Sequence, residues 1–161
     1  MNNFMENLIW LAPVLAVIAL IFAGIKTAKV SKADAGTDRM KEIASAISEG
    51  ARAFLFSEYK ILVIFVAVLF VLIGFGITWK TALCFLVGAL FSVAAGYAGM
   101  NVATKANVRT ANAAKSGMNK ALSIAFSGGS VMGMCVVGLG LLGCALIYII
   151  SGDVEILTGF S

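Results

Sequence analysis

Residues 99–133 decide how the chain is organised; they read GMNVATKANVRTANAAKSGMNKALSIAFSGGSVMG. This stretch leaves one apolar run, crosses a polar segment at 105–120 and enters a second apolar run. The polar segment contains no acid and four cations, Lys105, Arg109, Lys115 and Lys120. Cationic side chains near the ends of membrane helices resist translocation, whereas acidic side chains have little effect. We therefore predict a short cytoplasmic loop at 105–120 between two membrane-crossing segments.

The overall composition also indicates a membrane protein. Hydrophobic residues make up 61% of the 161-residue chain, and charged residues make up only 12%. A soluble domain is usually about 45–50% apolar and about 25% charged. A compact fold of this length could not bury so much apolar surface. The net charge of +4 lies in the connecting segments, so it predicts topology and contact with anionic lipid rather than nucleic-acid binding.

Four uncharged runs are long enough to cross a bilayer, and they lie at 8–25, 61–79, 81–104 and 121–150. The first run could also be a cleaved signal peptide, but residues 1–7 contain Glu6 as their one charged side chain and lack a basic start. We predict that it is a retained helix. The fourth run exceeds one crossing, so its helix should be tilted or project beyond the membrane.

The segment 26–60 is the longest polar part of the chain, with seven cations and five acids. We predict a loop over 26–36 and then an amphipathic helix, capped by Thr37 or Asp38, that runs into the second span. Gly50 is a place where this helix could bend. The acids alternate with cations, which is typical of a solvated helix face rather than a metal or catalytic site.

The cations predict the orientation of the helices. Seven lie in 26–60 and four lie in 105–120, whereas Lys80 is alone on the opposite side. The tail at 151–161 has two acids and no cation. We predict one all-α membrane domain over 1–161, a multi-pass bundle of four transmembrane helices. We predict that both termini lie outside the cytoplasm and that the second helix extends into the cytosol.

Small residues predict which helices pack closely. The third span has Gly88, Ser92 and Gly96 four residues apart, and the fourth has Ala125, Gly129 and Gly133 at the same spacing. Such faces allow helix backbones to approach each other. The second span is rich in Leu, Ile, Val and Phe and should face lipid. We place Trp79 at its far end, followed by a tight hairpin.

No catalytic, cofactor-binding or metal-binding residue is assigned in this chain. The four spans contain no ionisable Asp, Glu, Lys, Arg or His, which transporters usually place at membrane depth. No carboxylate cluster suits Mg²⁺. The glycine pair at 128–129 lacks the strand and the Lys-Ser/Thr of a P-loop.

Two groups of polar or reactive residues have alternative interpretations. The three cysteines, Cys84, Cys135 and Cys144, lie in apolar runs and read as small buried hydrophobes rather than a zinc site. Lys105 and Arg109 either set the topology or contact lipid headgroups or a phosphate.

Three segments resemble the membrane-integral, ion-pumping inorganic pyrophosphatases. They are GMNVATKANVRTANAA at 99–114, AFSGGSVMGMCVVGLGLLG at 125–143 and RMKEIASAISEGARAFLFSEYK at 39–60. The resemblance extends from about residue 8 to about residue 150. Family members have many more helices, and their acidic DxxxDxVGK-like motif and intramembrane ion gate do not occur here. We therefore expect an N-terminal fragment of a pump, inactive by itself.

The resemblance implies a function for the parent protein. Mg²⁺-dependent hydrolysis of diphosphate would drive export of H⁺ or Na⁺ across the cell membrane, by a homodimer of the full-length protein. The four helices would form an outer-layer scaffold for the remaining helices. The choice of ion and the need for K⁺ stay open. The alternatives are a complete small four-helix transporter and a membrane assembly subunit.

Overall fold

The chain folds into long helices in the computed structural model, which describes residues 2–160, with side chains described over 10–153 and 156–160. Every regular element in this range is a helix, and the elements are α1 (Asn2–Lys32), α2 (Asp38–Gly76), α3 (Trp79–Ala114), α4 (Met118–Ser151) and the short α5 (Val154–Leu157). The first four helices are long and apolar enough to cross a membrane. The predicted all-α bundle of four membrane-crossing helices is confirmed.

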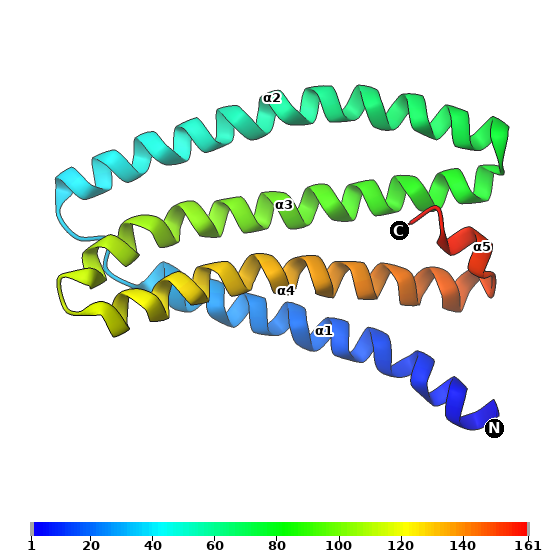
Figure 1. Ribbon diagram of the computed structural model, residues 1–161, viewed down its shortest axis with the longest axis horizontal. Coiled ribbons are helices and arrows are strands. Elements are labelled where there is room, and N and C mark those ends of the chain that lie inside the picture. Colours follow the sequence, from blue (N-terminus) through cyan, green and yellow to red (C-terminus); the bar gives the residue numbers. More distant parts are fainter. Residues whose placement is uncertain (1, 161) are drawn as a thin grey trace.

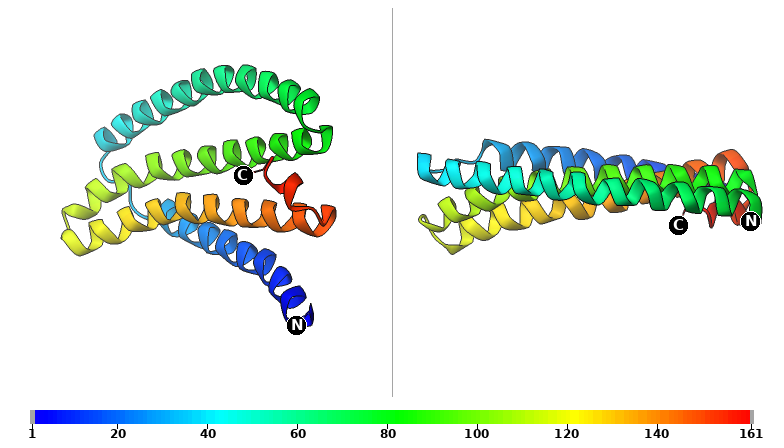
Figure 2. Two further views of the ribbon diagram at one scale, coloured as in Figure 1. Left: turned by 45° about the vertical axis from the view of Figure 1, so that its right-hand side comes forward. Right: turned by 90° about the horizontal axis from the view of Figure 1, so that it is seen from above.

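The four long helices lie side by side in the order α2, α3, α4, α1 (Figure 1). α3 and α4 form the centre, and α1 packs mainly on α4, while α2 contacts α3 alone among the helices described. Figure 2 shows from above that the layer is thin, and that at the connection side the end of α1 and the start of α2 lie above the end of α3 and the start of α4. The start of α1 and the end of α4 lie at one end of the layer, and the connections at 33–37 and 115–117 lie at the other.

Both polar connections are shorter than predicted. The predicted loop over 26–36 is wrong, because α1 continues to Lys32 and only residues 33–37 connect it to α2. The segment 105–120, predicted as a short cytoplasmic loop between two spans, is largely helical, because α3 continues to Ala114 and α4 begins at Met118. Ala, Lys and Arg favour helix, so a membrane helix can continue into water without losing its backbone hydrogen bonds.

The start of α2 is capped as predicted. Thr37 has an extended backbone, and its Oγ1 accepts a hydrogen bond from the N–H of Met40 at 3.4 Å. Asp38 lies in the first turn, where a carboxylate is favourable beside the helix dipole. α2 then continues through Gly50 as one uninterrupted helix, so the amphipathic segment and the second predicted span form a single element.

The connection between α2 and α3 is a tight two-residue turn, as expected, but Trp79 belongs to the other helix. α2 ends at Gly76, and Thr78 caps α3, whose first residue is Trp79. The indole packs back on α2, edge to face with Phe70 at 5.9 Å and with Phe75 at 5.2 Å between ring centroids. The threonine cap decides the boundary, because its side chain satisfies an N–H of the new helix.

The buried core lies where α1, α3 and α4 meet. Its members are small or β-branched and come from all three helices; they are Ala23, Val30, Val102, Ala106 and Val131. Val30 and Val131 are each 1% exposed. α2 contributes only Leu55 and Gly74 to the buried residues of the bundle. The core therefore belongs to three helices, and α2 is attached to its edge.

The glycines of α4 divide into a packed set and an open set. A Cβ at Gly128 would lie 2.7 Å from that of Ala106, and one at Gly138 would lie 2.9 Å from a methyl of Leu20. Gly129 and Gly133, which we expected to pack closely, have open space around the position of a Cβ. Packing of this face against another helix therefore stays a prediction, because successive glycines point to different sides of a helix and this chain occupies the side of Gly128 and Gly138.

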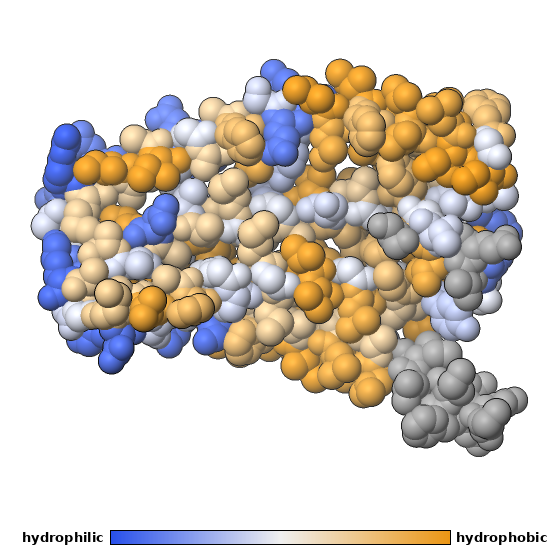
Figure 3. Space-filling view, in the orientation of Figure 1, coloured by the Kyte–Doolittle hydropathy of each residue, from blue (hydrophilic) through white to orange (hydrophobic). Residues whose placement is uncertain are grey.

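Figure 3 shows the distribution of hydropathy on one face of the molecule. Hydrophilic residues gather at the end that holds the connections 33–37 and 115–117, and hydrophobic residues cover the α2 half that lies nearer the α2–α3 turn. This pattern matches helices whose middle and far parts lie in lipid.

Candidate functional site

The cations of 105–120 were the candidate contacts for a headgroup or phosphate. Lys105 and Arg109 lie on successive turns of α3, Lys115 caps its end, and Lys120 lies in the first turn of α4. The polar end of the bundle is thus built from helix ends.

Arg109 joins α3 to the end of α1. Its Nε donates a hydrogen bond to the carbonyl of Ala33 at 2.9 Å, Nη2 donates to the carbonyl of Ser31 at 3.3 Å, and Nη1 donates to the carbonyl of Lys105 at 2.9 Å. The last carbonyls of a helix have no partner within the helix, and a cation there also complements the helix dipole. Arg109 therefore caps α1, a role that neither sequence interpretation contained.

Asn112 holds the connection between α1 and α2. Its Nδ2 donates to the carbonyl of Asp34 at 3.3 Å and to the Oδ2 of the same residue at 3.2 Å. The other carboxylate oxygen of Asp34 accepts the N–H of Gly36 at 2.9 Å. Arg109 and Asn112 are three residues apart on one face of α3, so together they fix both sides of the connection.

Gly36 and Asp34 show how closely this connection is fitted. Gly36 has φ +82°, and a Cβ there would lie 2.7 Å from Oδ1 of Asn112 and 2.7 Å from Sδ of Met40. The Gly36 N–H lowers the pKa of Asp34 from its ordinary 3.8, with help from Asn112 and from Lys41 and Lys115, against a smaller opposing effect of desolvation. The carboxylate is therefore ionised at neutral pH.

The other acids of 26–60 that show a partner form exposed pairs. Arg39 contacts Glu42 at 2.7 Å and Lys41 contacts Asp38 at 3.0 Å, both one turn apart on the surface of α2. Exposed pairs of this kind contribute little to stability. Over the described residues, no group of three or more His, Cys, Asp or Glu lies close enough to hold a metal ion.

The remaining sequence candidates lie inside helices. The glycine pair at 128–129 is part of α4 and forms no phosphate-binding turn. The cysteines Cys84, Cys135 and Cys144 are free thiols and only half-buried, so the prediction of small buried hydrophobes holds in part. Cys135 packs against the core described above.

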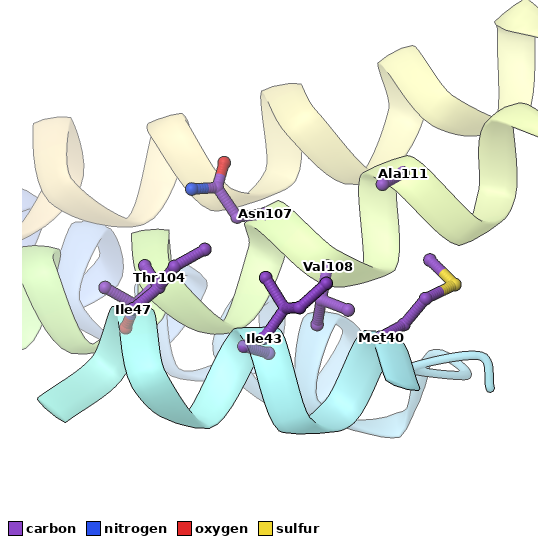
Figure 4. Close-up of a pocket in the computed structure, with 8 residues that line it drawn as sticks. Met40, Ile43, Ile47, Thr104, Asn107, Val108 and Ala111 are labelled. Atoms are coloured by element: carbon purple, nitrogen blue, oxygen red, sulfur yellow. The ribbon is translucent and has the colours of Figure 1, made fainter. Parts of the chain in front are cut away.

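Two apolar grooves lie along the seam between α2 and α3. The first, near the polar end, has a volume of about 290 Å³. Figure 4 shows Met40, Ile43 and Ile47 of α2 extending toward α3, so the apolar stripe of the amphipathic segment faces the bundle. The second groove, of about 390 Å³, lies within the predicted second and third spans. Sequence periodicity indicated the α2 stripe but could not show that the seam is incompletely filled.

Arg109 and Asn112 are the residues whose role the sequence interpretation missed. Two sequence features could have indicated this role. Arg109 and Asn112 are three residues apart and so share one face of a helix, and no glycine directly follows Lys32 to end the first helix. Finding their partners required the packing of α3 beside the end of α1, which lies more than seventy residues away in sequence.

Comparison with known proteins places the chain in a family. The family model for inorganic H⁺ pyrophosphatase matches residues 17–161. The chain is 54% identical over 157 residues to a Clostridium tetani protein with the provisional name of a K⁺-stimulated pyrophosphate-energized sodium pump. It is 46% identical over 158 residues to a K⁺-insensitive pyrophosphate-energized proton pump of Methanosarcina mazei, and 45% identical over 137 residues to a K⁺-stimulated pyrophosphate-energized sodium pump of Thermotoga maritima.

These matches cover most of this chain and a small part of each relative. They include 97, 97 and 84% of the chain but 23, 24 and 19% of the three relatives. The chain therefore spans about a quarter or less of the length of these proteins. The resemblance inferred from the three segments is confirmed, and this chain belongs to the inorganic H⁺ pyrophosphatase family.

Proposed function

We propose that this chain is the outer-layer scaffold portion of a pump that couples Mg²⁺-dependent hydrolysis of diphosphate to export of H⁺ or Na⁺. The observation that carries the proposal is the match of nearly the whole chain to a small part of relatives named as pyrophosphate-energized pumps. By itself the chain is expected to be inactive.

The open face of α4 supports the scaffold role. Gly129, Gly133 and Gly140 have open space around them, although the neighbouring Gly128 and Gly138 are packed against α3 and α1. Small residues in membrane helices allow another helix to approach closely. We propose that remaining helices of the parent protein pack on this open face.

The chemistry of the pump is assigned to the rest of the parent protein. The acids of this chain do not form a set that fits Mg²⁺ over the described residues. Its Arg109 is engaged with three carbonyls rather than presented to a substrate. Mg²⁺, diphosphate and the transported ion would therefore contact residues outside this chain, and the same residues would decide the response to K⁺.

The orientation is part of the proposal. The connections 33–37 and 115–117 would lie in the cytosol and both described ends of the bundle outside, because eleven of the twelve cations lie on the connection side of the predicted spans. A reporter fused to the C-terminus tests this. Alkaline phosphatase should be active there and green fluorescent protein should be dark, whereas the reverse pattern would refute the orientation.

A chimera tests the function. In it, this chain replaces the matching segment of the Methanosarcina mazei proton pump, and diphosphate hydrolysis and proton uptake are measured in vesicles. We expect the chimera to retain both activities and the chain alone to show no hydrolysis above background. The transported ion and the response to K⁺ should be those of the Methanosarcina mazei pump. The size of the chimera in detergent tests the homodimer that the resemblance implies.

The glycine variants Gly133→Leu and Gly50→Leu sharpen this experiment, since both positions are open in the chain alone. Gly133→Leu should reduce assembly of the chimera and both activities together, because it fills the proposed contact face. Gly50→Leu lies outside the predicted spans and should change neither. Hydrolysis by the chain alone would contradict the proposal, as would a folded, correctly inserted chimera without activity.

A further inference from the structure

The second groove between α2 and α3 is a bounded apolar site at membrane depth. Its volume is about 390 Å³, and its half-buried floor consists of Leu62, Val66 and Phe70 of α2 with Leu86, Ala89 and Val93 of α3. Residues 62–70 extend about 12 Å along the helix, most of the depth of one leaflet of hydrocarbon. The site therefore has the length and the chemistry of a slot for a hydrocarbon chain.

Both ends of the groove are closed by contacts between the two helices. At the polar end, the hydroxyl of Tyr59 donates a hydrogen bond to the carbonyl of Val93 at 3.2 Å. At the other end, Trp79 packs on Phe70 and fills the space beside Gly74, where a Cβ would lie 2.8 Å from the indole. A helix about 10 Å wide could not lie along a slot closed in this way, whereas a flexible acyl chain could enter from the side.

A cation lies at the polar end of the groove. Val63 and Ala67 line the rim of the groove. Lys60 precedes them by three and by seven residues, so the three side chains lie along one stripe of α2. Its ammonium lies 4.3 Å from the centroid of the Phe56 ring, and Arg52 lies two turns further along the same face. Glu58 is on the opposite edge of α2, away from this stripe. A phosphate at the membrane surface would meet Lys60 first.

We propose that this groove binds one phospholipid, with an acyl chain between α2 and α3 and its phosphate at Lys60. The lipid completes the packing of α2, which contacts only α3 among the described helices. The site depends on the membrane location of the helices and is independent of the proposed pump activity. A single bound lipid would exchange more slowly than the lipids that surround the bundle.

The test uses the full 161-residue chain reconstituted in lipid nanodiscs with phosphatidylglycerol that carries a nitroxide in the middle of one acyl chain. Electron paramagnetic resonance should show, beyond the signal of the lipids that surround the bundle, a slowly exchanging immobilised component equivalent to about one lipid per chain. Ala89→Phe fills the floor of the groove and should remove this component. Ala94→Phe adds the same bulk at an exposed position of the same helix and should leave it unchanged.

Lys60→Gln tests the headgroup contact without changing the groove. It should weaken the affinity of the labelled lipid about fivefold, as expected for the loss of one cation at an anionic surface. Lys26→Gln is its matched control, because Lys26 lies over Phe22 on α1 as Lys60 lies over Phe56 on α2. Circular dichroism should confirm that all four variants remain helical.

Three results would overturn the proposal. The first is the absence of the slowly exchanging immobilised component. The second is an equal loss of this component in Ala89→Phe and Ala94→Phe, which would indicate ordinary boundary lipid. The third is the loss of the component when the chain is part of the chimeric pump, which would show that a helix of the parent covers the groove. Activity of the chimera is a separate readout, so failure of the lipid site would leave the proposed function untouched.

Discussion

α4 and α2 are similar in length and both are apolar, yet they hold very different positions in the bundle. α4 packs against α1 on one side and α3 on the other, whereas α2 contacts α3 only. Seven residues of α4 are buried, compared with two residues of α2. The difference follows from side-chain size: glycines such as Gly128 and Gly138 let helices approach closely, whereas the bulky residues of α2 keep its neighbours away and suit lipid.

This comparison separates hydrophobicity from packing. In a membrane, apolar residues gain little by contacting each other instead of lipid, so helix association depends on fit and on hydrogen bonds. α2 depends on a few local contacts of this kind. Hydrogen bonds hold it at the connection 33–37 and at Tyr59, and the packing of Trp79 on Phe70 holds its end. Between these attachments the seam stays partly open.

The largest expected effect comes from adjacent glycines of α4. Gly128→Leu should lower the free energy of unfolding in detergent by about 3 kcal/mol, because the new side chain would overlap Ala106 in the core. Gly129→Leu should change it by less than about 0.5 kcal/mol, since its side chain enters open space. Unfolding followed by intrinsic tryptophan fluorescence measures both, and equal effects would mean that the packed and open faces are wrongly assigned.

The Arg109 cap should contribute the next largest effect. Arg109→Gln removes the charged donors that join α3 to the carbonyls of Ser31 and Ala33, so we expect a loss of about 2 kcal/mol. Faster hydrogen exchange in the last turn of α1 should accompany the loss. Lys105→Gln, one turn earlier on α3, is the control, and a comparable effect there would attribute the change to charge alone.

A smaller effect is expected where α2 is fastened at its start. Gly36→Ala should lower the free energy of unfolding by about 1–2 kcal/mol, because a Cβ is disfavoured at φ +82° and would press on Asn112. Limited proteolysis should show earlier cleavage in residues 33–37. Gly50→Ala, inside α2 with open space around it, should leave the free energy of unfolding unchanged or raise it slightly. If Gly50→Ala lowered it as much as Gly36→Ala does, the positive φ of Gly36 would not explain the effect.

The smallest effect is a dependence on pH. Because the folded pKa of Asp34 is below its ordinary 3.8, the interactions of its carboxylate are fully present above that value and are lost as pH falls through the lower folded pKa. Protection of the Gly36 N–H, measured as its exchange rate relative to that of an unstructured peptide at the same pH, should therefore fall only in the acid range below about pH 4. Asp34→Asn should abolish the acid-dependent change, and a transition near neutral pH would contradict the assignment.

Local sequence signals gave accurate information where one element alone decides the outcome. Thr37 was one of the two cap candidates predicted from residue type, with Asp38, and a tight connection between the second and third helices was predicted from the spacing of the apolar runs. Boundaries were less accurate where the signal was charge. Lys26, Lys29 and Lys105 were read as loop residues although helices continue through them, because a polar side chain marks water and not the end of a helix.

The candidate site was less predictable than the fold. Arg109 could be seen as a cation near a membrane boundary, but its carbonyl partners belong to a helix that ends more than seventy residues earlier. Gly129 and Gly133 were correctly seen as a small-residue face, whereas the side of α4 that this chain fills is the one with Gly128 and Gly138.

By itself, the sequence determined that the chain has four long helices that are apolar enough to cross a membrane, and which family it belongs to, because hydrophobic run length and motif are properties of contiguous residues. Only the tertiary structure decided that α1, α3 and α4 form the core, that Arg109 caps α1, and that the α2–α3 seam remains open. These features depend on which faces meet across distant segments, and lipid and protein are similarly apolar neighbours, so hydrophobicity alone cannot select between them.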